Sequence, residues 1–382
     1  MKNRVRLLRI ISTLNPKYGG PSKAIIDNSL YLKTKGIKVD IITNDPFGSK
    51  FYKGNKLKII NVGSKYLPIS FNPFLFFWIL KNKKKYNNFV VHGIWELNTI
   101  IANLLLKKNY YVFTHGQLDP YFRSEKLNII KKKIYWFLIE KKNLINSKSL
   151  LLTSINEKKL LNKTFVNTDG IKKTVVEYGI KKPKIDKKRL KKIFFNKFKF
   201  LKNKKFFLFL GRFHKKKGCE ILLHSMEKIL NNNKNIYLLM AGPSSKYKNN
   251  LIELSKELKI DKYIVWSDFL KNDLKWASIY KCEAMVLSSH GENFGISIIE
   301  SLSMSKPVLI TNKVNTASYI RKTYSGLVSN NTINSFYKIL NKFLKLNYVS
   351  KNKMHKNALS CYLRYFNLIN SNNKFVSLLR KN

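Results

Sequence analysis

The feature that most constrains the fold of this 382-residue chain is a repeated alternation of short β-branched runs with longer amphipathic stretches. The first series comprises "VRLLRIIS", a turn at "NPKYGGPS", a helical "SKAIIDNSLYLKTKG" and "IKVDIIT", and it continues through "FVVHG", "YYVFTHG" and "SLLLTS". Strands that alternate with helices form parallel sheets covered on both faces. The N-terminal half is therefore predicted to be a doubly wound α/β domain, with its first strand at the start of the chain.

A second series follows a polar, Lys-rich interval, "IKKPKIDKKRLKKIFFNKFKFLKNKK", which we interpret as a linker. Its predicted strands are "FFLFLG", "IYLLMAG", "YIVWSD", "AMVLSS" and "PVLIT", and the tail after about Lys351 is helical in pattern. A chain of this length is also long enough for about two domains. The sequence thus predicts two doubly wound, Rossmann-like parallel-sheet domains facing a cleft, which is the default ligand site.

The charge of the chain is extreme, at a formal net value of +53, which is typical of proteins that bind phosphate-rich partners. Only nine of the 74 basic residues are Arg, although Arg is the usual choice for recognising bases and phosphates. We therefore expect no nucleic-acid partner. Two explanations for the many Lys residues stay open: AT-rich coding, or attraction to an anionic membrane surface or anionic glycan.

Cysteine usage and hydropathy indicate the compartment. Cys219, Cys282 and Cys361 are scattered without a CxxC motif, as is usual in a reducing environment. No segment has the roughly 18 continuous apolar residues that a membrane span requires. We expect a cytoplasmic protein, soluble or peripheral on the inner face of the cytoplasmic membrane.

The motif "SSHGENFGISIIE" places two acids eight residues apart in a chain that has few acids. Glu292 is expected in a loop and Glu300 on the second turn of a helix that begins near Gly295. Eight helical residues span about 12 Å at most, too far for a glycosidase acid and base pair. The acids either hold hydroxyls of two different sugars or are a solvated loop acid and a helix-surface acid. The expected free amide donors at the helix N-terminus are those of Phe294, Gly295 and Ile296.

A second motif, "LGRFHKKKG", follows the first strand of the second series. Arg212 and Lys217 are expected at the carboxyl edge of the sheet, where ligands of open parallel sheets bind. Two cations there suit a diphosphate and can stabilise it as a leaving group without a metal. The alternative is a solvated basic turn. A P-loop is excluded because the GxxxxGK[ST] pattern is absent.

The first series has weaker signals. Gly19 and Gly20 lie between a strand and a helix, where a ligand can approach the backbone or a plain turn can form. His92 and His115 each end a strand in a His-Gly pair. The absence of HxH and HxxxH spacing argues against a metal site.

Together, the GG loop, His-Gly, GRxxxxKG, AGP and ENFGxxxxE followed by KPV resemble the family 4 retaining glycosyltransferases of GT-B architecture, over nearly the whole chain. "HGIW", "HGQLDP" and "SSHGENFG" are similar to members that build bacterial surface polysaccharides. The resemblance implies an acceptor-side domain over 1–182, a nucleotide-sugar-binding domain over 183–350 and a helical segment over 351–382 that crosses back to the first domain.

The resemblance also implies a role for each residue of the second domain. Arg212 and Lys217 would bind the donor diphosphate, and Glu300 would hold the ribose. Glu292 would contact hydroxyls of the transferred sugar. The amides beside that sugar would be those of Phe294, Gly295 and Ile296.

In the first domain, the resemblance implies that His115 is catalytic and lies next to the reacting centre. It also implies that Gly20 lines the phosphate side of the cleft and that Gly19 belongs to the substrate-binding residues. The sequence departs from the family pattern at Ser305, where Gly is usual, and in "NKVNTAS", where a Gly-rich loop often follows the Lys-Pro-Val strand. "EYGI" keeps Gly179 but not the Asn that often precedes it. The second departure leaves the identity of the donor open.

The function implied is transfer of a sugar, of hexosyl type and with retained configuration, from a nucleotide-sugar to a glycan or lipid-linked glycan acceptor. The expected pathway is biosynthesis of exopolysaccharide, capsule or lipopolysaccharide. No cofactor is expected beyond the nucleotide-diphosphate sugar donor, and no metal, since no DxD lies near a strand end. The alternative is a non-catalytic polyanion-binding protein on the same scaffold.

One further stretch, "KLNIIKKKIYWFLIEKK", has Leu127, Ile130, Ile134 and Phe137 at helical spacing and Lys on its other faces. This pattern is typical of a helix that lies in a membrane interface. It is equally typical of a domain helix packed on a sheet, and both interpretations stay open.

Overall fold

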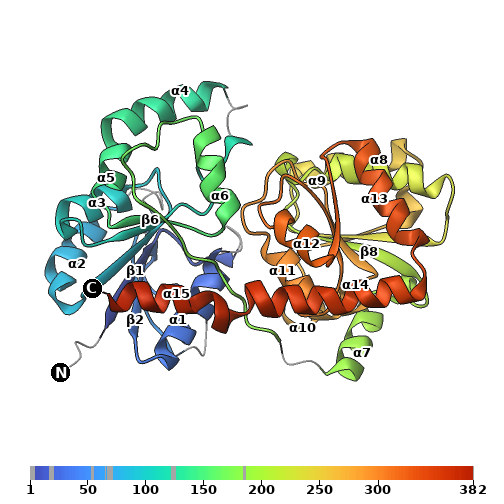
Figure 1. The fold of residues 1–382 in the computed structure, drawn as a ribbon, viewed down its shortest axis with the longest axis horizontal. Helices are drawn as coiled ribbons and strands as arrows, with labels where there is room; N and C mark the ends of the chain where they lie inside the picture. The colour runs from blue at the N-terminus through green and yellow to red at the C-terminus, as the bar shows by residue number, and fades with distance from the viewer. Residues whose placement is uncertain are drawn as a thin grey trace. The chain divides into compact units, whose positions relative to one another are not determined.

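The computed structural model describes residues 5–16, 21–52, 56–64, 66, 72–121, 126–183 and 186–381. The chain divides into two compact units: unit 1 comprises residues 1–179 and 368–382, and unit 2 comprises residues 180–367. Figure 1 shows that each unit is a sheet flanked by helices. The prediction of two doubly wound parallel sheets is confirmed.

The sheet of unit 1 has seven parallel strands in the order β3-β2-β1-β4-β5-β6-β7. The strand order reverses between β1 and β4, which are hydrogen-bonded neighbours with Ile11 opposite His92. The strands are β1 (Arg6–Ile11), β2 (Lys38–Pro46), β3 (Lys58–Gly63), β4 (Asn88–His92), β5 (Tyr111–Phe113), β6 (Ser149–Leu152) and β7 (Lys173–Val175).

Helices cover both faces of this sheet. The described helices of unit 1 are α1 (Pro21–Thr34), α2 (Phe74–Asn82), η2 (Lys83–Lys85), α3 (Leu97–Leu106), α4 (Lys126–Tyr135), the π-helix η4 (Trp136–Glu140), α5 (Lys141–Ile145), α6 (Ile155–Leu160), η5 (Leu161–Lys163) and α15 (Leu368–Arg380). Helices α2, α3 and α5 cover one face, and α1 covers the other.

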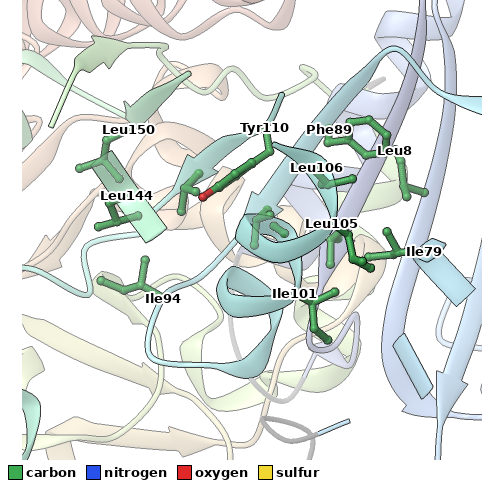
Figure 2. Packing of buried hydrophobic residues seen from close by; sticks show 14 of the residues in the cluster. Leu8, Ile79, Phe89, Ile94, Ile101, Leu105, Leu106, Tyr110, Leu144 and Leu150 are labelled. Carbon is green, nitrogen blue, oxygen red and sulfur yellow. The ribbon is translucent and has the colours of Figure 1, made fainter. Parts of the chain in front are cut away.

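The core of unit 1 forms because alternate strand residues point to the same face. Leu8 of β1, Phe89 of β4 and Leu150 of β6 point toward α2, α3 and α5, as Figure 2 shows. The helices contribute Ile79, Ile101, Leu105, Leu106 and Leu144 to the same cluster. This buried layer holds the strands in register, and so fixes the positions of the loops at their ends.

The sheet of unit 2 has six parallel strands in the order β10-β9-β8-β11-β12-β13. Its order reverses between β8 and β11, which pair directly. The strands are β8 (Lys205–Leu210), β9 (Ile236–Ala241), β10 (Ile264–Ser267), β11 (Ala284–Leu287), β12 (Val308–Thr311) and β13 (Gly326–Ser329). The described helices are α7 (Lys187–Lys197), η6 (Lys199–Leu201), η7 (Lys215–Lys217), α8 (Cys219–Leu230), α9 (Lys246–Glu257), η8 (Asp261–Tyr263), α10 (Asn272–Lys281), α11 (Ile296–Ser303), α12 (Ala317–Thr323), α13 (Ile333–Lys345), α14 (Tyr348–Cys361) and the π-helix η9 (Tyr362–Phe366).

The Lys-rich interval that we interpreted as a linker is largely helical, which corrects that interpretation. Helix α7 begins after Asp186, whose side chain accepts a hydrogen bond from the Arg189 amide. Leu190 and Phe194, four residues apart, are buried, and α7 packs beside α10 in unit 2. This helix is difficult to recognise in the sequence, because its apolar stripe is short and lysines occupy its other faces.

The tail is helical, as its pattern predicts, and its last helix belongs to unit 1. Helix α15 packs on α1, where the Asn28 and Asn372 side chains are hydrogen-bonded and Asn28 also bonds the buried guanidinium of Arg9. The division falls at residues 179 and 367, compared with the expected boundaries at 182 and 350.

Candidate functional site

Three predicted residues of unit 2 lie on loops at the point where its strand order reverses. The loop after β8 carries Arg212 and Lys217, and the loop after β11 carries Glu292. Because β8 and β11 are adjacent, both loops leave the same carboxyl edge of the sheet. Open parallel sheets bind their ligands at this position.

The two loops are joined by close backbone contacts. Gly218 has φ 63°, and a Cβ atom there would lie 2.1 Å from the Ser288 carbonyl oxygen. The Ser288 hydroxyl donates to the Gly218 carbonyl at 2.6 Å, and the Ser289 hydroxyl donates to the Lys216 carbonyl at 2.7 Å. Only glycine fits at position 218, because any side chain would separate the loops and strain the backbone.

Lys217 and Glu292 form an ion pair between these loops, 75 residues apart in sequence. Both side chains are only about a fifth exposed, at 20% and 17%. Burial raises the pKa of Glu292, but the charge and hydrogen bond of Lys217 outweigh burial and, with Lys216 and the Gly295 N–H, bring the net pKa below its usual value. Glu292 is therefore a fixed carboxylate at neutral pH.

The turn into α11 corrects the expectation that the Gly295 amide is free. Helix α11 begins at Ile296, and Gly295 precedes it with φ 68°. The Gly295 N–H donates to the Glu292 carboxylate, so this amide positions the acid and is not a free donor. The Phe294 ring is buried against Phe366, with ring centroids 5.9 Å apart.

Glu300 lies on the second turn of α11, as predicted, and is 8% exposed. Its carboxylate forms an ion pair with Lys275 of α10, whose ammonium also lies 4.4 Å from the centre of the Trp276 ring. Sequence reasoning missed Lys275, because "DLKWASIY" contains no spacing that distinguishes this Lys from the other lysines.

Arg212 is exposed and makes no hydrogen bond or ion pair with any residue that the structure describes. The structure thus brings Lys217 and Glu292 into contact, places Glu300 on the helix that follows, and leaves the Arg212 guanidinium available to an anion. A fixed carboxylate, a nearby ammonium and an available guanidinium can together bind a polyhydroxylated phosphate ester.

Two predicted residues of unit 1, both histidines, lie at the carboxyl ends of β4 and β5, beside its strand-order reversal. His92 ends β4 and is buried, and His115 follows β5 in the left-handed conformation, with φ 49°. His92 Nδ1 and His115 Nε2 lie 3.0 Å apart, so one ring nitrogen donates an N–H hydrogen bond to the other. The His115 ring also stacks on Tyr178.

Both imidazoles are held in the neutral state. Burial, and then the charge of Arg9, lowers the pKa of His115 to about 4. The same two causes, with His115 itself, place the pKa of His92 well below its ordinary value. Arg9 is fully buried, and its guanidinium lies 5.4 Å from the centre of the Phe375 ring.

Glu96 is a candidate that sequence reasoning missed. Its carboxylate accepts a hydrogen bond from the Ser12 hydroxyl just after β1 and lies beside Gly93 just after β4. Burial raises the pKa of Glu96 to about 7, against the lowering effect of the Ser12 bond. The sequence contained one signal for Glu96: it is an acid three residues after the His-Gly pair that ends β4, in a chain that has few acids.

Gly19 and Gly20 lie outside the described residues. Among the residues that are described, no three His, Cys, Asp or Glu side chains cluster as metal ligands would.

Most of unit 2 matches a known domain family. Residues 191–360 match the model described as "Glycosyl transferases group 1". The chain is 22% identical over 160 residues to the alpha-1,3/1,6-mannosyltransferase ALG2 of Dictyostelium discoideum, a match that spans 38% of each chain. It is 29% identical over 98 residues to the O-antigen biosynthesis glycosyltransferase WclY of Escherichia coli, and the matched residues make up 26% of each chain. The chain thus matches well under half the length of each of these relatives.

Two solved structures share the fold over almost their whole length. Sucrose-phosphate synthase of Thermosynechococcus elongatus superposes with a TM-score of 0.79 at 16% identity, covering 98% of both chains. Anabaena HepE in complex with UDP and glucose has a TM-score of 0.73 at 14% identity, covering 99% of this chain and 100% of that one. The fold is therefore the two-sheet GT-B architecture.

Proposed function

We propose that this protein is a retaining glycosyltransferase that moves a hexosyl group from a nucleotide-sugar to a glycan or lipid-linked glycan acceptor. The observation that carries the proposal is the contact between Lys217 and Glu292 at the strand-order reversal of unit 2. The match of residues 191–360 to the group 1 glycosyl transferases supports the same reaction class.

On this proposal, unit 2 holds the donor. Arg212 and Lys217 neutralise the diphosphate, and Glu292 accepts hydrogen bonds from hydroxyls of the transferred sugar. Glu300 accepts hydrogen bonds from the ribose. The ion pairs with Lys217 and Lys275 orient both carboxylates before the donor binds, so less reorganisation is needed on binding.

Bond cleavage leaves positive charge on the transferred sugar and negative charge on the departing diphosphate. The cations of unit 2 stabilise the diphosphate without a metal, and the Glu292 carboxylate stabilises the sugar. We assign His115 of unit 1 to the surroundings of the reacting centre. Its pKa of about 4 keeps it neutral, so it adds no positive charge beside an oxocarbenium-like sugar.

The pathway that we propose is bacterial surface-polysaccharide biosynthesis, supported by the similarity to an O-antigen glycosyltransferase. In that setting the protein works in the cytoplasm, on the inner face of the membrane, where a lipid-linked acceptor is presented. The donor is the only small-molecule partner required, with no further cofactor.

Saturation-transfer NMR against a panel of nucleotide-sugars tests the donor, and NMR of the product's anomeric proton tests retention. We expect one nucleotide-sugar to give a signal that Arg212→Ala weakens strongly. The polyanion-binding alternative predicts no signal from any nucleotide-sugar and equal binding of unrelated polyanions, and that result would replace our proposal.

A further inference from the structure

Exposed apolar side chains gather on consecutive helices of unit 1. Twenty large hydrophobic residues are exposed in the described part of the chain, and nine of them lie on α2, α3, α4, η4 and α5. Phe137 of η4 is 81% exposed and Phe77 of α2 is 65% exposed, so most of the surface of both residues is open to solvent. The nine are Phe74, Phe77, Leu80, Leu104, Ile130, Ile134, Phe137, Leu138 and Ile145.

These helices are neighbours on one side of the sheet. Helix α3 contacts α2, α5 and η4, and α4 continues directly into η4. Figure 1 shows them on the side of the sheet away from α1 and α15. The exposed residues therefore belong to one side of unit 1.

Helix α2 shows that the outward apolar residues are additional to the core. Its inward residues Leu75 and Ile79 are fully buried in the core. Its outward residues Phe74, Phe77 and Leu80 repeat every third position and face solvent. A helix that is apolar all round is normally covered on all sides. The outward apolar side chains of α2 are therefore exposed to solvent, although a helix of this composition is normally buried.

The same helices carry exposed positive charge and no exposed negative charge. Residues 74–85, 97–108 and 130–145 contain a single acid, Glu140, and this side chain is fully buried. We call this surface the basic apolar face and define it by the nine apolar residues above and by exposed lysines on or next to these helices. The lysines are Lys81, Lys84, Lys85, Lys107, Lys108, Lys131, Lys133 and Lys142.

We propose that the basic apolar face docks on an anionic lipid bilayer. Its rings and aliphatic side chains would enter the boundary between headgroups and acyl chains, and its lysines would meet the lipid phosphates. No helix in the described part of the chain is long and apolar enough to cross a bilayer, so this contact is interfacial. The proposal concerns binding alone and does not depend on the proposed activity.

The combination of lysines and exposed apolar side chains favours an anionic bilayer over other binding partners. A second copy of the chain would bring the same lysines opposite one another, with no exposed carboxylate among these helices to pair with them. A soluble polyanion would satisfy the lysines but would leave Phe77 and Phe137 in water. A bilayer with anionic headgroups satisfies both kinds of side chain.

Vesicle sedimentation of the full chain tests the proposal. We expect binding to phosphatidylcholine vesicles that contain phosphatidylglycerol, and weak binding to phosphatidylcholine alone. Phe77→Ser with Phe137→Ser should lower the affinity roughly tenfold or more, because two rings no longer leave water. The matched control, Tyr348→Ser with Val349→Ser, alters two exposed residues of α14 in unit 2 and should bind as the wild type does. Equal loss in both double variants, or no binding at all, would overturn the proposal.

A fluorescent label reports whether the face enters the lipid. The three native cysteines are buried, so a cysteine introduced at the surface can be labelled selectively. An environment-sensitive dye on Phe137→Cys should brighten and shift to the blue with anionic vesicles, and the same dye on Tyr348→Cys should not. A dimer in solution that Phe77→Ser with Phe137→Ser dissociates, with no change of the dye on vesicles, would assign the face to a second copy instead.

Discussion

At the scale of single residues, the two acids of "ENFGISIIE" have different surroundings. Glu292 is fixed by the loop of Lys217, and Glu300 by Lys275 of a separate helix. On the proposed function, Glu292 touches the sugar that changes during the reaction, and Glu300 touches a ribose that does not. The two acids should therefore act on different kinetic constants.

Glu292→Gln is expected mainly to lower kcat. The carboxylate can bind more strongly as the sugar gains positive charge, and a neutral amide cannot. Single-turnover rates at saturating donor would show the loss, with circular dichroism to confirm folding. Glu253→Gln, an exposed acid of α9 paired with Lys256, is the matched control and should be unaffected. A normal rate for Glu292→Gln would remove the acid from the chemistry.

Glu300→Gln is expected to weaken donor binding by about 1 to 3 kcal/mol, the value of a hydrogen bond to a charged group. Calorimetric titration with the donor would give the change in Kd. The rate at saturating donor should change little, because the ribose contacts are the same in the ground and transition states. A variant with normal donor affinity and a slow rate would reverse the roles assigned to the two acids.

At the level of secondary-structure elements, the π-helix η4, which lies between α4 and α5, ends in an acidic residue whose side chain is buried. Glu140 is fully buried, with the Thr99 hydroxyl donating to it at 3.0 Å. Burial raises its pKa to about 8, against the lowering effect of the Thr99 hydrogen bond, and the charge of Glu96 adds to the rise. Glu140 therefore takes up a proton on folding over much of the neutral range.

This raised pKa predicts that the free energy of unfolding falls as pH rises. The folded state holds the Glu140 proton up to about pH 8, and the unfolded state releases it near the ordinary value of 4.5. The loss is at most about 1.4 kcal/mol for each pH unit in that window, and it stops above it. Glu96, with a pKa of about 7, adds a loss of the same sign.

Urea unfolding of wild type and Glu140→Gln between pH 5 and 8 would isolate this effect. The Gln variant keeps the size and polarity of the side chain but has no proton to release. We expect the difference in stability between the two proteins to shift in favour of the variant as pH rises. Parallel curves would mean that Glu140 titrates normally in the folded state.

At the scale of the whole molecule, the loops at the strand-order reversal of unit 2 carry two cations, Arg212 and Lys217. We expect turnover to survive EDTA, because Arg212 and Lys217 can neutralise the diphosphate. Rates measured with and without chelator would check this. Loss of activity in EDTA, restored by Mg²⁺ or Mn²⁺, would contradict the expected metal independence.

The alternation of strands and helices in the sequence predicts the architecture, and it assigns the motifs after the strands to the carboxyl edges of the two sheets. Alternating strands and helices make a parallel sheet, and every parallel strand delivers the residues that follow it to the same edge. "GRFHKKKG" and "HGENFG" were therefore assignable to one edge before any contact was known. The left-handed turns at Gly218 and Gly295 occur at glycines, where such turns cost least.

Which side chains come into contact depends on how the elements pack, and the sequence pattern does not show it. Lys217 pairs with Glu292 across 75 residues, and Lys275 with Glu300, in a chain that offers dozens of equivalent lysines. Arg9 is buried with its guanidinium 5.4 Å from the ring centre of Phe375, from the opposite end of the chain, and its charge adds to the burial of His115 in keeping that imidazole neutral. Local patterns carry no information on such pairs, because the distance between two side chains depends on how the loops and helices between them pack.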